Sequence, residues 1–223
     1  MRFRTTKNPN HSLDTFQLTK QEIESQVLSD LVTYKRKFYE KYSKSASTPL
    51  DVDSYIKELW GFNICFENIE QDSEDRETLG YLRPEKQQVI VDENCDNQKR
   101  ISFTLAHEAG HLSLHKSLFL EENGLIVGWR YPDLSGNKKR KDKAEIRREW
   151  QANTYAGALL APKPEVEFFL EEVGLLRNRL LISFDLNEYF PKFEERFGLS
   201  RQALEIRLRQ LGIPFTGLRY GEV

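Results

Sequence analysis

The chain has few of the features that mark extracellular or membrane proteins. It contains only two cysteines, Cys65 and Cys95, and no CxxC pair. This scarcity excludes a disulfide framework and favours two buried thiols in a reducing compartment over one disulfide. No run of about 18 apolar residues occurs, so no segment is expected to span a bilayer. The basic N-terminus lacks the apolar stretch of a secretory signal, and we therefore expect a cytoplasmic protein that does not bind membranes.

A strong excess of either charge is also missing. Lysine and arginine number 33, aspartate and glutamate 35, and the formal net charge is −2. This balance argues against extensive nucleic-acid binding, although it leaves room for a local basic patch. Residues 138–143 (KKRKDK) form such a patch, for which a solvated loop is favoured over a contact with DNA phosphates or an acidic partner. The length of 223 residues suits one large domain, or one domain with an appendage.

Local patterns predict a mixture of helices and short strands. Apolar residues recur every three or four positions in residues 16–43, which predicts a helix followed by a linker at 43–49. A short helix should end near Gly61, a strand should cover 63–67, and a hairpin should join 79–83 to 87–91. Further helices are predicted at about 142–160 and 164–173, and Asp96 or Asn97 is expected to cap the helix that follows it.

Histidine is rare, yet three of the four histidines lie in TLAHEAGHLSLH, residues 104–115. On a helix, His107 and His111 lie one turn apart on the same face and can direct two imidazole nitrogens at one ion. Glu108 follows the first histidine and can reach a water activated by that ion without binding the ion itself. Two metal ligands and a general base in this order are typical of H-E-x-x-H enzymes. The competing interpretation is an ordinary helix that carries unrelated histidines.

A zinc site with catalytic function needs a third protein ligand. His115 continues the spacing, but three such positions span about 12 Å of helix, so His115 is expected to flank the site. Glu149 and Asn153 lie four residues apart on the next predicted long helix. Glu149 can supply the third ligand, and Asn153 can hold a histidine in one tautomer. The alternative for Glu149 is a solvated carboxylate on the helix surface. Tyr155 is a candidate donor to the oxyanion, but a packed aromatic side chain in the core is favoured for this residue.

Two segments, FTLAHEAGHLSLH (103–115) and EWQANTYAGALLAP (149–162), resemble the ImmA/IrrE-type zinc metallopeptidases. Weaker similarity lies in QQVIVD and in FGLSRQALEIRLRQLG, and together the resemblance covers roughly residues 50–213. It implies an α+β fold with a zincin-like core, in which a small, mainly antiparallel sheet packs on the active-site helix. It also implies His107, His111 and Glu149 as metal ligands and Glu108 as catalytic base. We accordingly predict a helical extension at 1–48 and a peptidase domain at 49–223, which includes the C-terminal helices.

The resemblance also implies the kind of partner. Members of the family typically cleave a helix-turn-helix repressor, and some belong to pairs that resemble toxin and antitoxin. We therefore expect a protein substrate of this kind, cut by a zinc-activated water. Two imidazoles and a carboxylate also suit Mn²⁺ or Fe²⁺, so the identity of the ion stays open.

Two alternatives stay open. The C-terminal segment 197–212 has a helix-turn-helix pattern, with Gly198 at the turn and Ser200 as a helix cap. If this segment binds DNA, the chain is a DNA-binding regulator with a structural metal site. The favoured interpretation is that the helices of this segment pack on the peptidase core. The apolar stripe of the N-terminal helix could pair with another copy, dock a repressor or pack on its own domain. The oligomeric state is not predicted.

Overall fold

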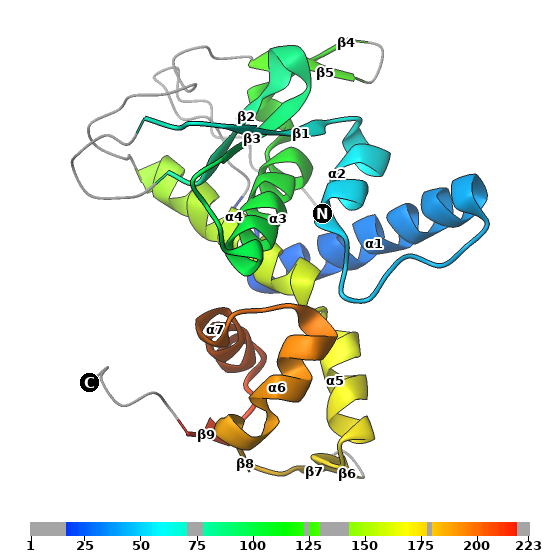
Figure 1. Cartoon of the computed structure of the whole chain (residues 1–223), viewed down its shortest axis with the longest axis vertical. Coiled ribbons are helices and arrows are strands. Elements are labelled where there is room, and N and C mark those ends of the chain that lie inside the picture. Colours follow the sequence, from blue (N-terminus) through cyan, green and yellow to red (C-terminus); the bar gives the residue numbers. More distant parts are fainter. Residues whose placement is uncertain (1–16, 71–77, 123–124, 130–142, 178–179, 218–223) are drawn as a thin grey trace, which may run out of the picture.

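The computed structural model describes residues 17–70, 78–122, 125–129, 143–177 and 180–217, and these form an α+β fold. Figure 1 shows two parts, with the three-stranded sheet and α1–α4 above and α5–α7 below. The helices are α1 (Lys20–Tyr42), α2 (Val52–Trp60), α3 (Gln98–Leu114), α4 (Lys143–Leu160), α5 (Lys163–Glu172), α6 (Leu186–Phe197) and α7 (Arg201–Leu211). The 3-10 turns are η1 (Pro84–Lys86) and η2 (Lys116–Leu118).

The main sheet consists of β1 (Asn63–Glu67), β2 (Gly80–Arg83) and β3 (Gln88–Asp92) in the order β1-β3-β2. The predicted hairpin is present as β2 and β3, joined by η1. The expectation of a mainly antiparallel sheet is wrong in one respect, because β1 pairs with β3 in parallel. In the central strand β3, the successive residues Val89, Ile90 and Val91 are all fully buried, which indicates that both faces of this strand are covered.

The other strands are short and lie at the periphery. They pair as β4 (Phe119–Glu122) with β5 (Leu125–Trp129), β6 (Leu176–Arg177) with β7 (Leu180–Leu181), and β8 (Phe184–Asp185) with β9 (Phe215–Thr216). Both cysteines are free thiols, as predicted, but they are half-buried, not fully buried. No described helix is long and apolar enough to cross a bilayer. Of the basic patch at 138–143, residues 138–142 lie outside the described residues.

The close packing of α3 on α4 depends on a glycine. A Cβ atom added at Gly110 would lie 3.0 Å from the Cα atom of Ala152 and 3.1 Å from its carbonyl oxygen. Only glycine therefore allows the backbones of the two helices to approach this closely. Asn97 caps the start of α3, where its side chain accepts hydrogen bonds from the backbone N–H groups of Lys99 and Arg100. The result is a rigid pair of helices beneath the sheet.

The N-terminal helix α1 packs on its own domain. Its apolar stripe, Ile23, Val27, Leu31 and Tyr34, is buried in the main core. Asp30 extends the contact with polar bonds, because its Oδ2 accepts hydrogen bonds from Ser113 on α3 (2.5 Å) and Tyr155 on α4 (2.7 Å). Of the three interpretations of the stripe, packing on the domain is therefore the one observed. The division of the chain at residues 48 and 49 stays a prediction.

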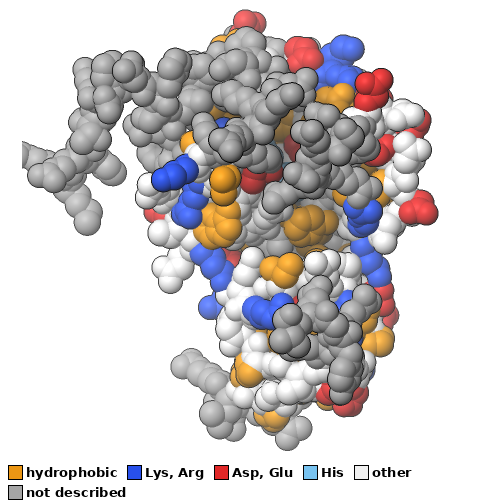
Figure 2. All heavy atoms as spheres, turned by 90° about the vertical axis from the view of Figure 1, so that its left-hand side faces the viewer, with side chains coloured by type: hydrophobic (Ala, Val, Ile, Leu, Met, Phe, Trp, Pro, Cys, Tyr) orange, Lys and Arg blue, Asp and Glu red, His pale blue; other side chains and the backbone are white. Residues whose placement is uncertain are grey.

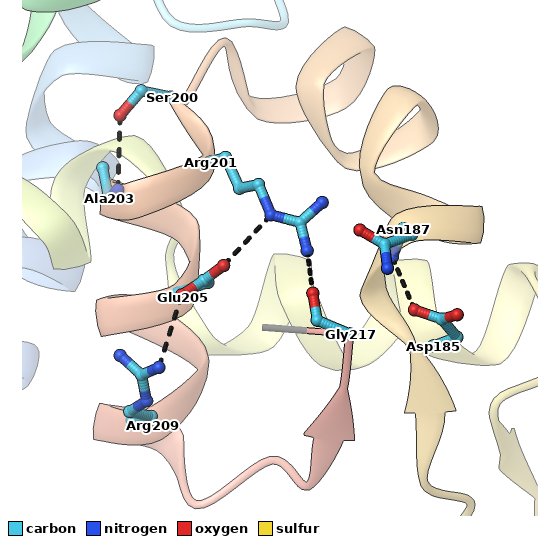
Figure 3. A network of polar contacts seen from close by, with 8 residues as sticks. All are labelled: Asp185, Asn187, Ser200, Arg201, Ala203, Glu205, Arg209 and Gly217. Atoms are coloured by element: carbon cyan, nitrogen blue, oxygen red, sulfur yellow. Dashed lines mark hydrogen bonds and ion pairs between the residues drawn. The ribbon is translucent and has the colours of Figure 1, made fainter. Parts of the chain in front are cut away.

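The C-terminal segment has the predicted local geometry. Gly198 ends α6 in the left-handed conformation (φ 66°), and the Ser200 side chain caps α7 by accepting a hydrogen bond from the backbone of Ala203. Figure 3 shows that two arginines of α7 bind the same carboxylate, since Arg201 and Arg209 donate to Glu205 at 3.1 and 3.3 Å. Arg201 also donates to the carbonyl of Gly217.

Candidate metal centre

Two histidines of α3 point their Nε2 atoms toward each other. His107 and His111 lie one turn apart, and their Nε2 atoms are 3.1 Å from each other. Both side chains are partly exposed, at 17%, so the pair opens to solvent at one side. The spacing of four residues on a regular helix thus brings the two nitrogens together as the sequence suggested.

Glu149 on α4 completes a triangle of ligand atoms. Its Oε2 lies 3.7 Å from His107 Nε2, and its Oε1 lies 3.5 Å from His111 Nε2. Among the described residues these three side chains form a group whose ligand atoms all lie within 4.8 Å of one another. Zinc–ligand bonds of 2.0–2.2 Å in a tetrahedron place neighbouring ligands about 3.3 Å apart. The three separations, 3.1, 3.5 and 3.7 Å, are close to that value.

The hydrogen bonds behind the histidines determine which nitrogen carries the proton. Asn153 presents its carbonyl oxygen to His107 Nδ1 at 3.0 Å, so Nδ1 donates and Nε2 keeps its lone pair. His115 lies behind His111, with 2.9 Å between the two Nδ1 atoms, and its Nε2 donates to the carbonyl oxygen of Gln151 at 2.9 Å. Burial lowers the pKa of His115 to about 4, so this ring is neutral at pH 7. Because neutral His115 donates through Nε2, its Nδ1 has a lone pair and accepts a hydrogen bond from the Nδ1–H group of His111. The proton of His111 is therefore on Nδ1, and its Nε2 also keeps a lone pair.

Two lone pairs only 3.1 Å apart, with a carboxylate beside them, require a positive charge between them. The donor set of two imidazoles and one carboxylate suits zinc and leaves a fourth position for water or substrate. The arrangement fits a divalent cation on these grounds. It does not distinguish zinc from manganese or iron, because the same donors bind all three.

Glu108 lies on the buried side of α3 and is only 6% exposed. Burial, and after it the negative charge of Glu149, raises the pKa of Glu108 to about 8. The carboxyl group therefore holds a proton at neutral pH when no cation is near. A divalent cation would favour the ionised form, because its charge opposes both effects.

One residue beside the centre, Gln151, was not predicted from the sequence. Gln151 is fully buried and fixes His115, but nothing in its sequence context distinguishes it from any other helical glutamine. Tyr155 lies in the core, as favoured over a role as oxyanion donor: its hydroxyl group lies 2.7 Å from that of Tyr55 and donates a hydrogen bond to the carboxylate of Asp30. His115 flanks the centre, and Glu149, although 34% exposed, lies beside both histidines.

Comparison with known proteins gives a match to one family model and similarity to solved structures. The model of the family described as "Peptidase_M78: IrrE N-terminal-like domain" matches residues 58–209. A solved structure described as "Mycobacterium tuberculosis transcriptional regulator" is similar with a TM-score of 0.48 and 13% sequence identity. The alignment covers 87% of this chain and 51% of that one, so the chain spans about half the length of that protein. No curated protein matched.

Proposed function

The chain belongs to the IrrE N-terminal-like domain family, Peptidase_M78, and on this basis we propose that it is a zinc-dependent endopeptidase. The observation that carries the proposal is the convergence of two histidine lone pairs and one carboxylate on a single point. In the proposal His107, His111 and Glu149 hold the ion. Asn153 and His115 hold the two imidazoles in the tautomers that bind it.

When bound, the cation would supply a hydroxide nucleophile at neutral pH and polarise the carbonyl group of the scissile peptide bond. Glu108 transfers the protons in this scheme. Its carboxylate accepts a proton from the attacking water and then delivers that proton to the nitrogen of the leaving amine. A bound cation would keep Glu108 ionised for the first transfer, because its charge opposes the burial that raises the pKa of this carboxyl group.

The substrate we propose is a helix-turn-helix repressor or an antitoxin partner, met in the cytoplasm. This part of the proposal rests on family resemblance alone. It predicts that the wild-type chain cuts such a repressor at one or a few bonds and that the Glu108→Gln variant does not. Equal cleavage by both proteins would contradict the role given to Glu108.

Metal analysis is the direct test of the centre. Elemental mass spectrometry of the purified chain should find about one zinc per molecule in the wild type and none in His111→Ala. Glu108→Gln should keep the zinc and lose turnover, because its side chain is not a ligand. Absence of metal from the wild type after reconstitution with Zn²⁺, Mn²⁺ and Fe²⁺ would refute the proposal.

DNA binding through α7 is the second candidate function, and the arginines of α7 argue against it. Arg201 and Arg209 share Glu205, and the fully buried Arg207 is used inside the molecule. Much of the positive charge of α7 is therefore compensated within the molecule, which weakens its attraction to phosphates. Were the chain a DNA-binding regulator, its affinity for duplex DNA would fall steeply with salt and would survive Glu108→Gln.

A further inference from the structure

A cavity of about 610 Å³ lies between α3, α4 and α7. It adjoins the metal centre, because its lining includes Asn153, whose side chain accepts a hydrogen bond from His107. From there it extends over Phe103 and Trp150 to Ala203 and Ile206 of α7. The helix-turn-helix segment therefore forms one wall of a cleft, and its other wall is formed by α3 and α4, the helices that also carry the candidate metal ligands.

Two large apolar side chains of this cleft are exposed to solvent. Trp150 is 39% exposed and Ile206 is 47% exposed, although burial of such side chains is normally favourable. The guanidinium group of Arg147 lies over the Trp150 ring, 4.1 Å from its centroid, and limits the orientations of the indole. Figure 2 shows hydrophobic side chains gathered on this face, between the sheet-bearing part and the part that holds α5–α7.

Two basic residues that line the cleft are already paired. Lys99 binds Glu194 of α6. Arg207 binds Glu24 of α1 with both terminal nitrogens and also donates to the carbonyl of Ala161. The charges of these two residues are therefore compensated inside the molecule. Arg100 is the one other basic residue in the described lining, so the cleft offers little positive charge to a phosphate or a nucleic acid. The exposed apolar surface instead fits an apolar side chain of a polypeptide.

We propose that the cleft is a specificity site for the substrate, in which Trp150 and Ile206 receive a large apolar side chain close to the scissile bond. The proposal rests on the endopeptidase function proposed above and adds the class of residue that the enzyme selects: leucine, isoleucine, phenylalanine or methionine. The helix-turn-helix segment then serves to recognise protein substrate. Its apolar residue Ile206 discriminates by burying the selected side chain, an effect worth roughly 10- to 200-fold in kcat/KM.

The test uses the zinc-loaded full chain and a library of synthetic peptides, with the cleaved bonds identified by mass spectrometry. Large apolar residues should be enriched at one position beside the bond. Two variants then separate the cleft from the rest of the surface. Ile206→Ser changes the cleft, and Ile146→Ser changes an equally exposed isoleucine (57%) on α4 that does not line it.

The expected result is a loss of about tenfold in kcat/KM for Ile206→Ser on peptides with leucine at the selected position. Peptides with alanine there should be cut as by the wild type, and Ile146→Ser should be unchanged on both. Unfolding curves and zinc content confirm that the variants are intact. Cleavage without apolar preference, or equal losses on leucine and alanine peptides, would overturn the proposal and leave the peptidase function standing.

A binding measurement separates the two proposals if no bond is cut. Glu108→Gln protein loaded with zinc is titrated with dye-labelled leucine and alanine peptides, followed by fluorescence anisotropy. Tighter binding of the leucine peptide that disappears with Ile206→Ser would support the cleft while the peptidase function fails. Equal binding of both peptides would refute the specificity site.

Discussion

The buried position of Glu108 predicts that replacing it with glutamine stabilises the metal-free protein at high pH. Folding raises the pKa of Glu108 from 4.5 to about 8, mainly through burial. The folded state therefore binds more protons than the unfolded state between these values, and stability falls as pH rises through that range. The pKa difference is equivalent to roughly 3–6 kcal/mol in the free energy of unfolding. Glutamine has the same shape and no charge, so Glu108→Gln avoids this loss.

Urea denaturation of both proteins in EDTA, from pH 4.5 to 9, measures the effect. The free energies of unfolding should be similar at pH 4.5, and the variant should exceed the wild type by several kcal/mol at pH 9. Taking the difference between the proteins cancels the titration of all other groups. A difference that does not change with pH would refute the reasoning. Added zinc should reduce the pH dependence, because the cation stabilises the ionised carboxylate.

Three further substitutions test the packing around the centre. Gly110→Ala should push α3 from α4, cost about 1–3 kcal/mol by overpacking and weaken zinc binding. Asp30→Asn should cost about 2–3 kcal/mol, because one oxygen now accepts hydrogen bonds from two hydroxyl groups. Glu24→Gln should cost about 3 kcal/mol or more, because it leaves the buried charge of Arg207 without its partner. Urea denaturation and zinc titration measure these effects.

Each of these substitutions has a matched control. Gly157→Ala places its Cβ no closer than 3.6 Å to another side chain and should be neutral or stabilising. Glu40→Gln removes an exposed carboxylate from α1, and Ser29→Ala an exposed hydroxyl beside Asp30; both should have little effect. Losses in the controls as large as those in the test variants would show that the contacts named above do not set the stability.

The sequence predicts best what depends on neighbours along the chain. A helix brings residues four apart together, so the spacing of His107 and His111 was enough to place their nitrogens side by side. The ends of helices follow from single residues for the same reason. Gly61 and Gly198 adopt the left-handed conformation at which α2 and α6 end, as their positions in the sequence indicated.

Contacts between distant segments could not be predicted in this way. The hairpin of β2 and β3 is local, but the parallel pairing of β1 with β3 joins strands separated by β2 itself. The role of Gln151 depends on His115, 36 residues away on another helix. Neither contact can be recognised from the neighbouring residues in the sequence. Alternation and helical spacing of apolar residues indicate which face of an element is buried, but not which element packs on that face.

The N-terminal helix α1 is another element whose contacts could not be predicted from the sequence. The apolar stripe of α1 predicted that one face of the helix is buried, but it did not indicate which surface covers that face. In the structure Asp30 binds hydroxyl groups on α3 and α4, and Glu24 binds Arg207 of α7, which lines the cleft. One helix thus joins both elements that hold the candidate metal ligands to the wall that is proposed to select the substrate. Changes in α1 should therefore alter zinc binding through Asp30 and peptide selection through Glu24, although neither residue lies in the metal centre.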